Sequence, residues 1–476
     1  MDLVLLLQTT RRSFLAQRAT SCGRSSGTSR LSTMVRASLV LLLLMQLVAC
    51  AAPTETPVAV AASGPTQLPT VTPVPTDMPT ATVTPTATAL PTATVVPEPR
   101  YDLVLVGGTL IDATGAPPLE NAAIAIQGRH IVEITTADLL RYSADTPVYD
   151  MRGATIMPGF INAHVHISGL SDDDLRHWTR AGVTTLRDLA GPLDELVATR
   201  NRMRESEDPA FPRLLIAGPI VTVDGGYPFA VREQSLRVEG LAVRDTDDAR
   251  AIVTMLADSG ADAIKLAVSG RTDVHWMELS DEEIAAITAT AHARGLRVSS
   301  HVDRVVALRR AVLNGIDNAA HSPRDRLPDD VIALMVEHGV SLTPTIAVYE
   351  ALARQRGNEV VWRKQMLPVM YDNLRRFVAA GGILALGDDY GGVPGMPIGM
   401  PIAELMHWQA AGLSPQQIIE ASTYGSAEAL GLETELGTVE VGKLADLLIV
   451  QGDPLSNLSA LTQPLLVVRH GQVIAP

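Results

Sequence analysis

Six side chains that can bind or bridge metal ions stand at the ends of short apolar runs, each followed by a loop. They are His164, His166, Lys265, His301, His321 and Asp389. Imidazole nitrogens and carboxylate oxygens are the ligands that proteins offer to zinc and similar ions when thiolates are absent. Loops that follow parallel strands meet at one end of the sheet, so these residues should come together. The pattern predicts one binuclear metal centre.

The four histidines differ in how strongly each one indicates a metal site. His164 and His166 are two apart, so both side chains share a face if a strand runs through them. A lone pair of this kind is more often two buried or surface histidines, but the run from Pro158 to His166 favours a metal site. His301 and His321 would serve a second metal, although each alone is more often a structural histidine.

Lys265 is one of only three lysines in the chain, and it stands inside the apolar run Ala-Ile-Lys-Leu-Ala. Burial of an ammonium group is costly and lowers its pKa. A neutral amine can react with CO2 to form a carbamate, an anionic oxygen ligand that can bridge two metal ions. The alternative is a lysine whose ammonium reaches solvent at the end of its strand. We expect the carbamate.

Asp389 follows the last of these apolar runs, directly after Asp388. A carboxylate at this place can contact a metal and can take and return the proton of an attacking water molecule. Strand alternation allows only one of the two side chains to point inward. We expect Asp389 to be the catalytic residue, with Asp388 as the rival.

The elements that must position these residues alternate short apolar runs with helices. Eight such runs occur, at 159–163, 184–187, 214–217, 263–266, 297–300, 318–320, 340–343 and 383–386. Capping boxes begin helices at Ser280 and Ser414. This α/β pattern predicts a (β/α)8 TIM barrel over residues 157–435. Strand-like runs at 101–156 and 436–476 predict a small β-sandwich-like domain built from both ends of the folded region.

Composition limits the partners and the metal ligands. The 476-residue chain has a net charge of −14, which argues against nucleic acid. Its two cysteines, Cys22 and Cys50, lie in the first 50 residues, so the predicted centre has only nitrogen and oxygen ligands. The substrate should be a small molecule, and a homo-oligomer is left open.

The first 100 residues read as export and tether sequences. Residues 1–50 contain an apolar run too short for a comfortable membrane span, and they end in Leu-Val-Ala-Cys50, which resembles the lipobox of bacterial lipoproteins. Residues 51–100 hold eleven of the 31 prolines and predict an extended tether. We expect export and a lipid anchor at Cys50 on the outer face of a bacterial membrane. A chance cysteine, a start at Met34 instead of Met1, and a twin-arginine signal at Arg11-Arg12 remain alternatives.

The chain resembles the metal-dependent amidohydrolase superfamily, and within it the imidazolonepropionase-like and prolidase-like branch. The resemblance covers residues 101–476 and includes the motifs at 182–188, 343–345, 421–427 and 442–446. It implies that one metal is bound by His164, His166 and Asp389, and a second by His301 and His321. Carboxylated Lys265 would bridge two divalent ions, expected to be zinc.

The resemblance also implies a reaction. A hydroxide shared by the two metals would attack an amide or peptide C–N bond of a dipeptide, an N-acyl amino acid or a cyclic amide, with Asp389 shuttling the proton. Arg187 and Tyr227 are candidates to hold a substrate carboxylate; a structural salt bridge is the alternative for Arg187. Three segments depart from the family pattern: Gly387-Asp-Asp389, Ala320-His-Ser322 and Gly225-Gly-Tyr-Pro228. The resemblance therefore implies the reaction class and not a particular substrate. A mononuclear deaminase of the same superfamily and a non-catalytic solute-binding lipoprotein are the alternative functions.

Overall fold

The computed structural model describes residues 98–229, 239–268 and 278–474. The predicted signal peptide, its lipobox at Cys50 and the tether up to residue 97 lie outside the described residues, so the structure does not test them. In the part of the chain that is described, no helix has both the length and the apolar character needed to cross a membrane.

Strands from both ends of the chain form one mixed sheet. Its path is β17-β16-β15-β5-β1-β2-β3, with β4 paired to β1. The strands are β1 (Leu103–Leu110), β2 (Leu119–Gln127), β3 (His130–Thr136), β4 (Val148–Asp150), β5 (Ala154–Pro158), β15 (Leu447–Gln451), β16 (Pro464–Arg469) and β17 (Gln472–Ile474). Antiparallel pairing of β5 with β15 joins the two ends.

The assembly from both ends agrees with the prediction, but the β-sandwich-like form is wrong, because these strands form a single sheet. The faces of that sheet explain why. Leu447 and Ile449 of β15 pack with Leu105 and other side chains of β1 and β2. Leu448 and Val450, which point the other way, belong to the large core that includes the helices. That core covers the second face at β15, and Leu140 packs on the same face at Val104 of β1 and Ala123 of β2, so no second sheet is needed to bury it.

Parallel strands form the centre of the remaining chain. One sheet has the order β6-β7-β8 and the other β10-β9-β11-β12-β13-β14. The strands are β6 (Phe160–Val165), β7 (Val183–Asp188), β8 (Arg213–Ile216), β9 (Ile220–Val223), β10 (Gly240–Val243), β11 (Ala263–Ala267), β12 (Arg297–His301), β13 (Asn318–Ala320) and β14 (Ser341–Thr343). The first seven predicted runs coincide with seven of these strands, whereas β9 and β10 were not predicted.

The eighth predicted run, 383–386, is not a strand. Leu384 makes only an isolated bridge to Leu342 of β14. The backbone N–H of Ala163 in β6 donates to the carbonyl of Leu386, but the N–H of Leu386 itself donates to Ser426 Oγ. The hydroxyl takes the place of a ladder partner and interrupts the pairing. The strands therefore do not form a closed barrel ladder in the described residues.

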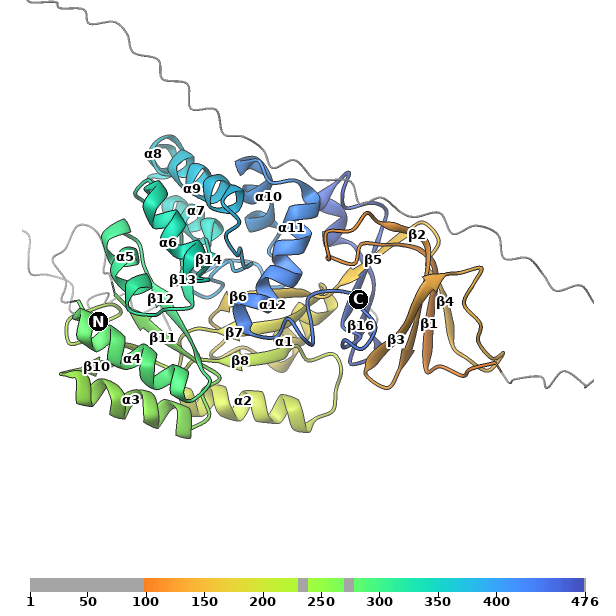
Figure 1. Cartoon of the computed structure of the whole chain (residues 1–476), viewed down its shortest axis with the longest axis horizontal. Coiled ribbons are helices and arrows are strands. Elements are labelled where there is room, and N and C mark those ends of the chain that lie inside the picture. Colours follow the sequence, from red (N-terminus) through yellow and green to blue (C-terminus); the bar gives the residue numbers. More distant parts are fainter. Residues whose placement is uncertain (1–97, 230–238, 269–277, 475–476) are drawn as a thin grey trace, which may run out of the picture. The chain divides into compact units, whose positions relative to one another are not determined.

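Helices surround these parallel strands, while β1 to β4 gather apart from them (Figure 1). The α-helices are α1 (Asp172–Arg180), α2 (Leu193–Glu205), α3 (Thr246–Asp258), α4 (Asp281–Ala293), α5 (Val305–Leu313), α6 (Asp329–Glu337), α7 (Ile346–Gln355), α8 (Glu359–Gln365), α9 (Leu367–Ala379), α10 (Ile402–Ala411), α11 (Pro415–Glu420) and α12 (Ser426–Leu430). Both predicted capping boxes are present, at Ser280 and Ser414.

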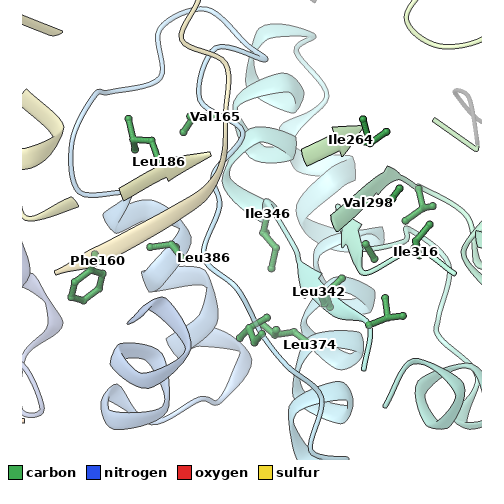
Figure 2. Packing of buried hydrophobic residues seen from close by; sticks show 14 of the residues in the cluster. Phe160, Val165, Leu186, Ile264, Val298, Ile316, Leu342, Ile346, Leu374 and Leu386 are labelled. Carbon is green, nitrogen blue, oxygen red and sulfur yellow. The ribbon is translucent and has the colours of Figure 1, made fainter. Parts of the chain in front are cut away.

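The common core joins strands to helices. Figure 2 shows Phe160 of β6, Ile264 of β11 and Leu342 of β14 in one cluster with Leu374 of α9. All four side chains are fully or almost fully buried. This packing holds the carboxyl ends of the parallel strands in place, and those ends carry the predicted metal ligands.

Candidate metal centre

His164, His166 and Asp389 meet at the carboxyl end of β6. Nε2 of His164 lies 3.2 Å from Asp389 Oδ1, and Nε2 of His166 lies 2.9 Å from the same oxygen. The ligand atoms of the three residues all lie within 4.8 Å of one another. Within the described residues, however, Asp389 Oδ1 accepts no hydrogen bond of acceptable geometry. Three ligand atoms that converge without a donated hydrogen suit a shared metal ion.

The backbone beside Asp389 is shaped for this approach. Asp389 has φ 57°, in the left-handed region that costs free energy for a residue with a side chain. A Cβ on Gly387 would lie 2.8 Å from His164 Cβ, and one on Gly391 would lie 2.4 Å from the carbonyl oxygen of His166. Glycine at these two positions allows the Asp389 loop to pass close to both histidines.

His301 and His321 continue the cluster from the ends of β12 and β13. The His321 ring lies 5.0 Å from that of His164 and 4.6 Å from that of His301, centroid to centroid. His321 has φ 106°. Its Nδ1 is 2.7 Å from Thr345 Oγ1, which fixes the ring orientation and leaves Nε2 for another partner.

Lys265 lies in the middle of β11, opposite Ser299 of β12. Its side chain is buried, with 1% of the residue exposed, and Nζ has no hydrogen-bond partner in the described part of the chain. Burial lowers the pKa of Lys265 to about 7. A substantial fraction of the amine is therefore neutral near neutral pH, the form that can react with CO2.

The imidazoles are held largely in their neutral, ligating form. Burial lowers the pKa of His301 to about 3, and it also lowers the pKa values of His164 and His321 well below the ordinary range. For His166 burial acts in the same direction, but the contact with Asp389 outweighs it and raises the pKa. Three neutral histidines in a buried cluster suit a cation in their midst.

The rival carboxylate, Asp388, has a different place. Its Oδ1 accepts a hydrogen bond of 2.8 Å from Asn162 Nδ2 and one of 3.3 Å from the backbone N–H of Tyr390. Burial raises the pKa of Asp388 to about 6. Asp389, and not Asp388, lies against the two histidines of β6.

The two predicted substrate contacts lie in unlike surroundings. Arg187 is buried, and its Nε and Nη2 donate to the carbonyl oxygen of Ala163 and to Asn318 Oδ1. Those bonds tie β7 to its neighbour β6 and to β13 of the other parallel sheet. This is close to the structural alternative, except that an amide takes the place of a carboxylate. The Tyr227 ring stacks on that of His301, with centroids 4.3 Å apart and planes 9° from parallel. Tyr227 therefore borders the centre, whereas Arg187 lies within the strands.

Sequence reasoning assigned no role to three supporting residues. Thr345 contacts His321, and Asn162 donates to Asp388. Asp188, at the end of β7, accepts from the N–H groups of Ile167 and Ala190 and so holds the loop after His166. Thr345 and Asp188 fall in motifs recognised in the sequence, and their positions just after strands were the available signal.

The residues present fit a divalent metal centre. Within the described ranges, His164 Nδ1, Lys265 Nζ and Asp389 Oδ1 are buried polar atoms without hydrogen-bond partners. Such atoms are costly unless an unseen water or ion satisfies them. Neutral imidazoles and a carboxylate are also the nitrogen and oxygen ligands that zinc and related ions accept.

Comparison with known proteins agrees with this chemistry. The model of the amidohydrolase family matches residues 155–474. An imidazolonepropionase of Symbiobacterium thermophilum is 26% identical over 389 residues, which cover 73% of this chain and 91% of that protein.

Solved structures give the same fold. A Xaa-Pro dipeptidase with methionine bound in its active site has a TM-score of 0.69 at 23% identity, covering 79% of this chain and 100% of the other. A candidate prolidase from Bifidobacterium longum has a TM-score of 0.67 at 28% identity, covering 78% of this chain and 94% of the other. The family model matches well over half of the length of this chain. The chain therefore belongs to the amidohydrolase family and is a hydrolase acting on carbon–nitrogen bonds.

Proposed function

We propose that the protein is a binuclear metal-dependent amidohydrolase that cleaves an amide or peptide bond of a small substrate. The observation that carries this proposal is the convergence of His164, His166 and Asp389 within 4.8 Å. The adjoining rings of His301 and His321 and the buried amine of Lys265 supply ligands for a second ion. A mononuclear deaminase would have no use for Lys265.

Each residue has a role in this proposal. His164, His166 and Asp389 would hold one ion, His301 and His321 would hold the other, and a carboxylated Lys265 would supply a ligand to both. Bound divalent ions, for which zinc is our first candidate, would polarise the scissile carbonyl and acidify a water molecule. Asp389 takes the proton of the attacking water at its carboxylate and returns it to the leaving nitrogen.

The substrate class rests on the relatives. The similar proteins include a Xaa-Pro dipeptidase and an imidazolonepropionase. We therefore propose dipeptides, N-acyl amino acids and cyclic amides as the compounds to screen. Tyr227 stacks on His301 and is positioned to contact such a substrate. Arg187 would act indirectly, through the strands that it ties together. We also propose that the parallel strands and residues 383–386 together make a (β/α)8 barrel over residues 157–435, supported by the hydrogen bonds from this segment to β6 and β14.

Export is a separate proposal that rests on sequence alone. Lipidation at Cys50, after a signal peptide over residues 1–50, would place the enzyme on the outer face of a bacterial membrane, with residues 51–100 as tether. Mass spectrometry of the mature N-terminus tests this. A diacylglyceryl cysteine is expected at Cys50, and an unmodified upstream sequence would contradict the proposal.

The metal content of the full chain, expressed with zinc and bicarbonate, tests the proposed function. About two equivalents are expected for the binuclear centre, with a sharp fall in Lys265→Ala. Lys364→Ala is the matched control, because Lys364 is exposed on α8. One equivalent that is insensitive to Lys265→Ala would favour the mononuclear deaminase. No metal would favour the solute-binding lipoprotein.

A further inference from the structure

A second buried polar cluster lies at the opposite ends of the parallel strands. Arg213 is the first residue of β8, whereas His164 and His301 lie at or next to the last residues of β6 and β12. Arg213 borders a cavity of about 450 Å3, whose lining also includes Arg129, Arg200, Arg204 and Arg469. Five arginines therefore face one cavity in a protein whose net charge is −14.

Backbone hydrogen bonds fix the walls of this cavity. Ala445 N–H donates to the carbonyl of Arg129, in the turn between β2 and β3, at 2.8 Å. The next residue, Asp446, accepts the N–H of His470 at 2.8 Å, and Gly159, just before β6, donates to the carbonyl of Asp446 at 2.8 Å. These bonds join the mixed sheet to the first parallel strand beside the cavity.

The cations of the inner wall outnumber their carboxylate. Arg469 is 3% exposed, its Nη1 lies 3.2 Å from Asp446 Oδ1, and its Nε has no hydrogen-bond partner in the described residues. Arg213 Nε is likewise buried without a partner among them. Burial alone would raise the pKa of Asp446, but the charges of Arg469 and Arg213 lower it. One carboxylate therefore lies beside two guanidinium groups, and its Oδ2 also has no hydrogen-bond partner among the described residues.

The acidic side chains of the lining do not supply the missing partner. Asp208 forms an ion pair of 2.8 Å with Arg176. Glu207 and Glu435 are exposed, where water screens their charge. Arg129 is also exposed, and within the described ranges its side chain makes no hydrogen bond or ion pair. The unused Nε donors of Arg213 and Arg469 are buried, whereas the carboxylates of Glu207 and Glu435 are exposed.

We propose that this cavity binds a small oxyanion, a phosphate or a carboxylate-bearing metabolite, through Arg129, Arg213 and Arg469. The planar guanidinium fork matches the oxygen geometry of both anions and makes paired, charge-assisted hydrogen bonds to them. Because the arginines come from the mixed sheet and from β8, the bound anion links the sheet to the strands. This site shares no residue with the metal centre, and it binds an anion, whereas the metal centre binds cations.

Calorimetric titration of the metal-loaded full chain at constant ionic strength tests the proposal. The probes are inorganic phosphate and, separately, succinate; saturable binding of only one of them identifies the source of the oxyanion. Arg129→Gln should weaken that binding about tenfold, and Arg213→Gln at least as much. Arg141→Gln, an exposed arginine that does not line the cavity, is the matched control.

Three results would overturn the proposal. The absence of saturable heat with either phosphate or succinate would rule out the anion site. Binding unchanged by both Arg129→Gln and Arg213→Gln would place the anion elsewhere, for instance at the metal centre. Equal weakening by Arg141→Gln would reduce the effect to general screening of charge. Circular dichroism of Arg213→Gln guards against misfolding, and Arg129→Gln, in an exposed turn, keeps the test valid if β8 is disturbed.

Discussion

The two ends of the parallel strands leave different kinds of buried atoms without protein partners. At the carboxyl ends these atoms include Asp389 Oδ1, His164 Nδ1 and the amine of Lys265, whose pKa burial lowers to about 7. At the amino ends they include the guanidinium Nε donors of Arg213 and Arg469, together with Asp446 Oδ2. The difference teaches that one scaffold can present sites for ligands of opposite sign, a cation at one end and an anion at the other.

The strongest way to break this comparison is at Asp389. Asp389→Asn removes a negative ligand and the proton acceptor, so kcat/KM should fall about 10³- to 10⁴-fold. The assay uses a dipeptide or N-acyl amino acid that the wild-type enzyme hydrolyses. Asp388→Asn is the matched control, because an amide oxygen can still accept from Asn162 and Tyr390. Equal losses in both variants would reject Asp389 as the proton shuttle.

At the amino ends the corresponding change should affect stability and leave chemistry unchanged. Asp446→Asn leaves Arg469 and Arg213 without their carboxylate, and the side chains of Asp446 and Arg469 are only 2% and 3% exposed. We expect a loss of about 3 to 4 kcal/mol in the free energy of unfolding, with unchanged metal content. Urea titration and metal analysis of one preparation measure both. A loss of metal would show that the two ends are coupled.

A third prediction concerns the helices behind the metal centre. Glu404 of α10 is fully buried and accepts from the N–H of Ala347, at the start of α7, and from Trp408 Nε1. Burial raises the pKa of Glu404 to about 7, above the 4.5 of a free carboxyl. The folded protein therefore keeps a proton that the unfolded chain releases. The resulting stability is fully present below about pH 4.5 and is lost as the pH rises through about 7.

The size of this effect is about 3 kcal/mol between these limits. Glu404→Gln cannot titrate, so its free energy of unfolding should fall less than that of the wild type between about pH 5 and about pH 8. Urea unfolding at both values measures the difference. Glu282→Gln, a change at an exposed residue of α4, serves as control. Parallel pH profiles for wild type and Glu404→Gln would count against the raised pKa.

The smallest effect is expected at Thr345. Thr345→Val removes the hydroxyl that contacts His321 Nδ1 but keeps the shape of the side chain. Loss of such an orienting contact typically weakens metal binding about 10- to 100-fold. Competition with a chromogenic chelator measures the affinity. Thr290→Val on α4 is the control, because its hydroxyl bonds only to the carbonyl of Ala286 in its own helix. Unchanged affinity would mean that packing alone orients His321.

The sequence was most informative where the signal is local. Lys265 and the histidines stand out because polar residues end apolar runs, and the capping boxes at Ser280 and Ser414 need only four neighbouring residues. Seven of the eight predicted apolar runs coincide with strands, because a short apolar run is also a local signal. β9 and β10, of four residues each, were nevertheless not predicted from their local sequence.

Contacts between residues far apart in the chain could not be predicted from local sequence. Residues 383–386 fail as a strand because Ser426, forty positions later, takes the N–H of Leu386. Thr345 supports His321 across 24 positions. The single mixed sheet replaced the expected sandwich because the helical core covers Leu448 and Val450. Each outcome depends on tertiary packing, which periodicity along one segment does not contain.

The pairing of β5 with β15 has a consequence for biosynthesis. Ile156 lies opposite Ile449, so the central strand of the mixed sheet waits for a partner made nearly 300 residues later. Until β15 leaves the ribosome, β5 has an open edge that invites aggregation or proteolysis. A truncated chain would keep that edge and be open to degradation. The mixed sheet can therefore be completed only after the C-terminal part of the chain has been synthesised.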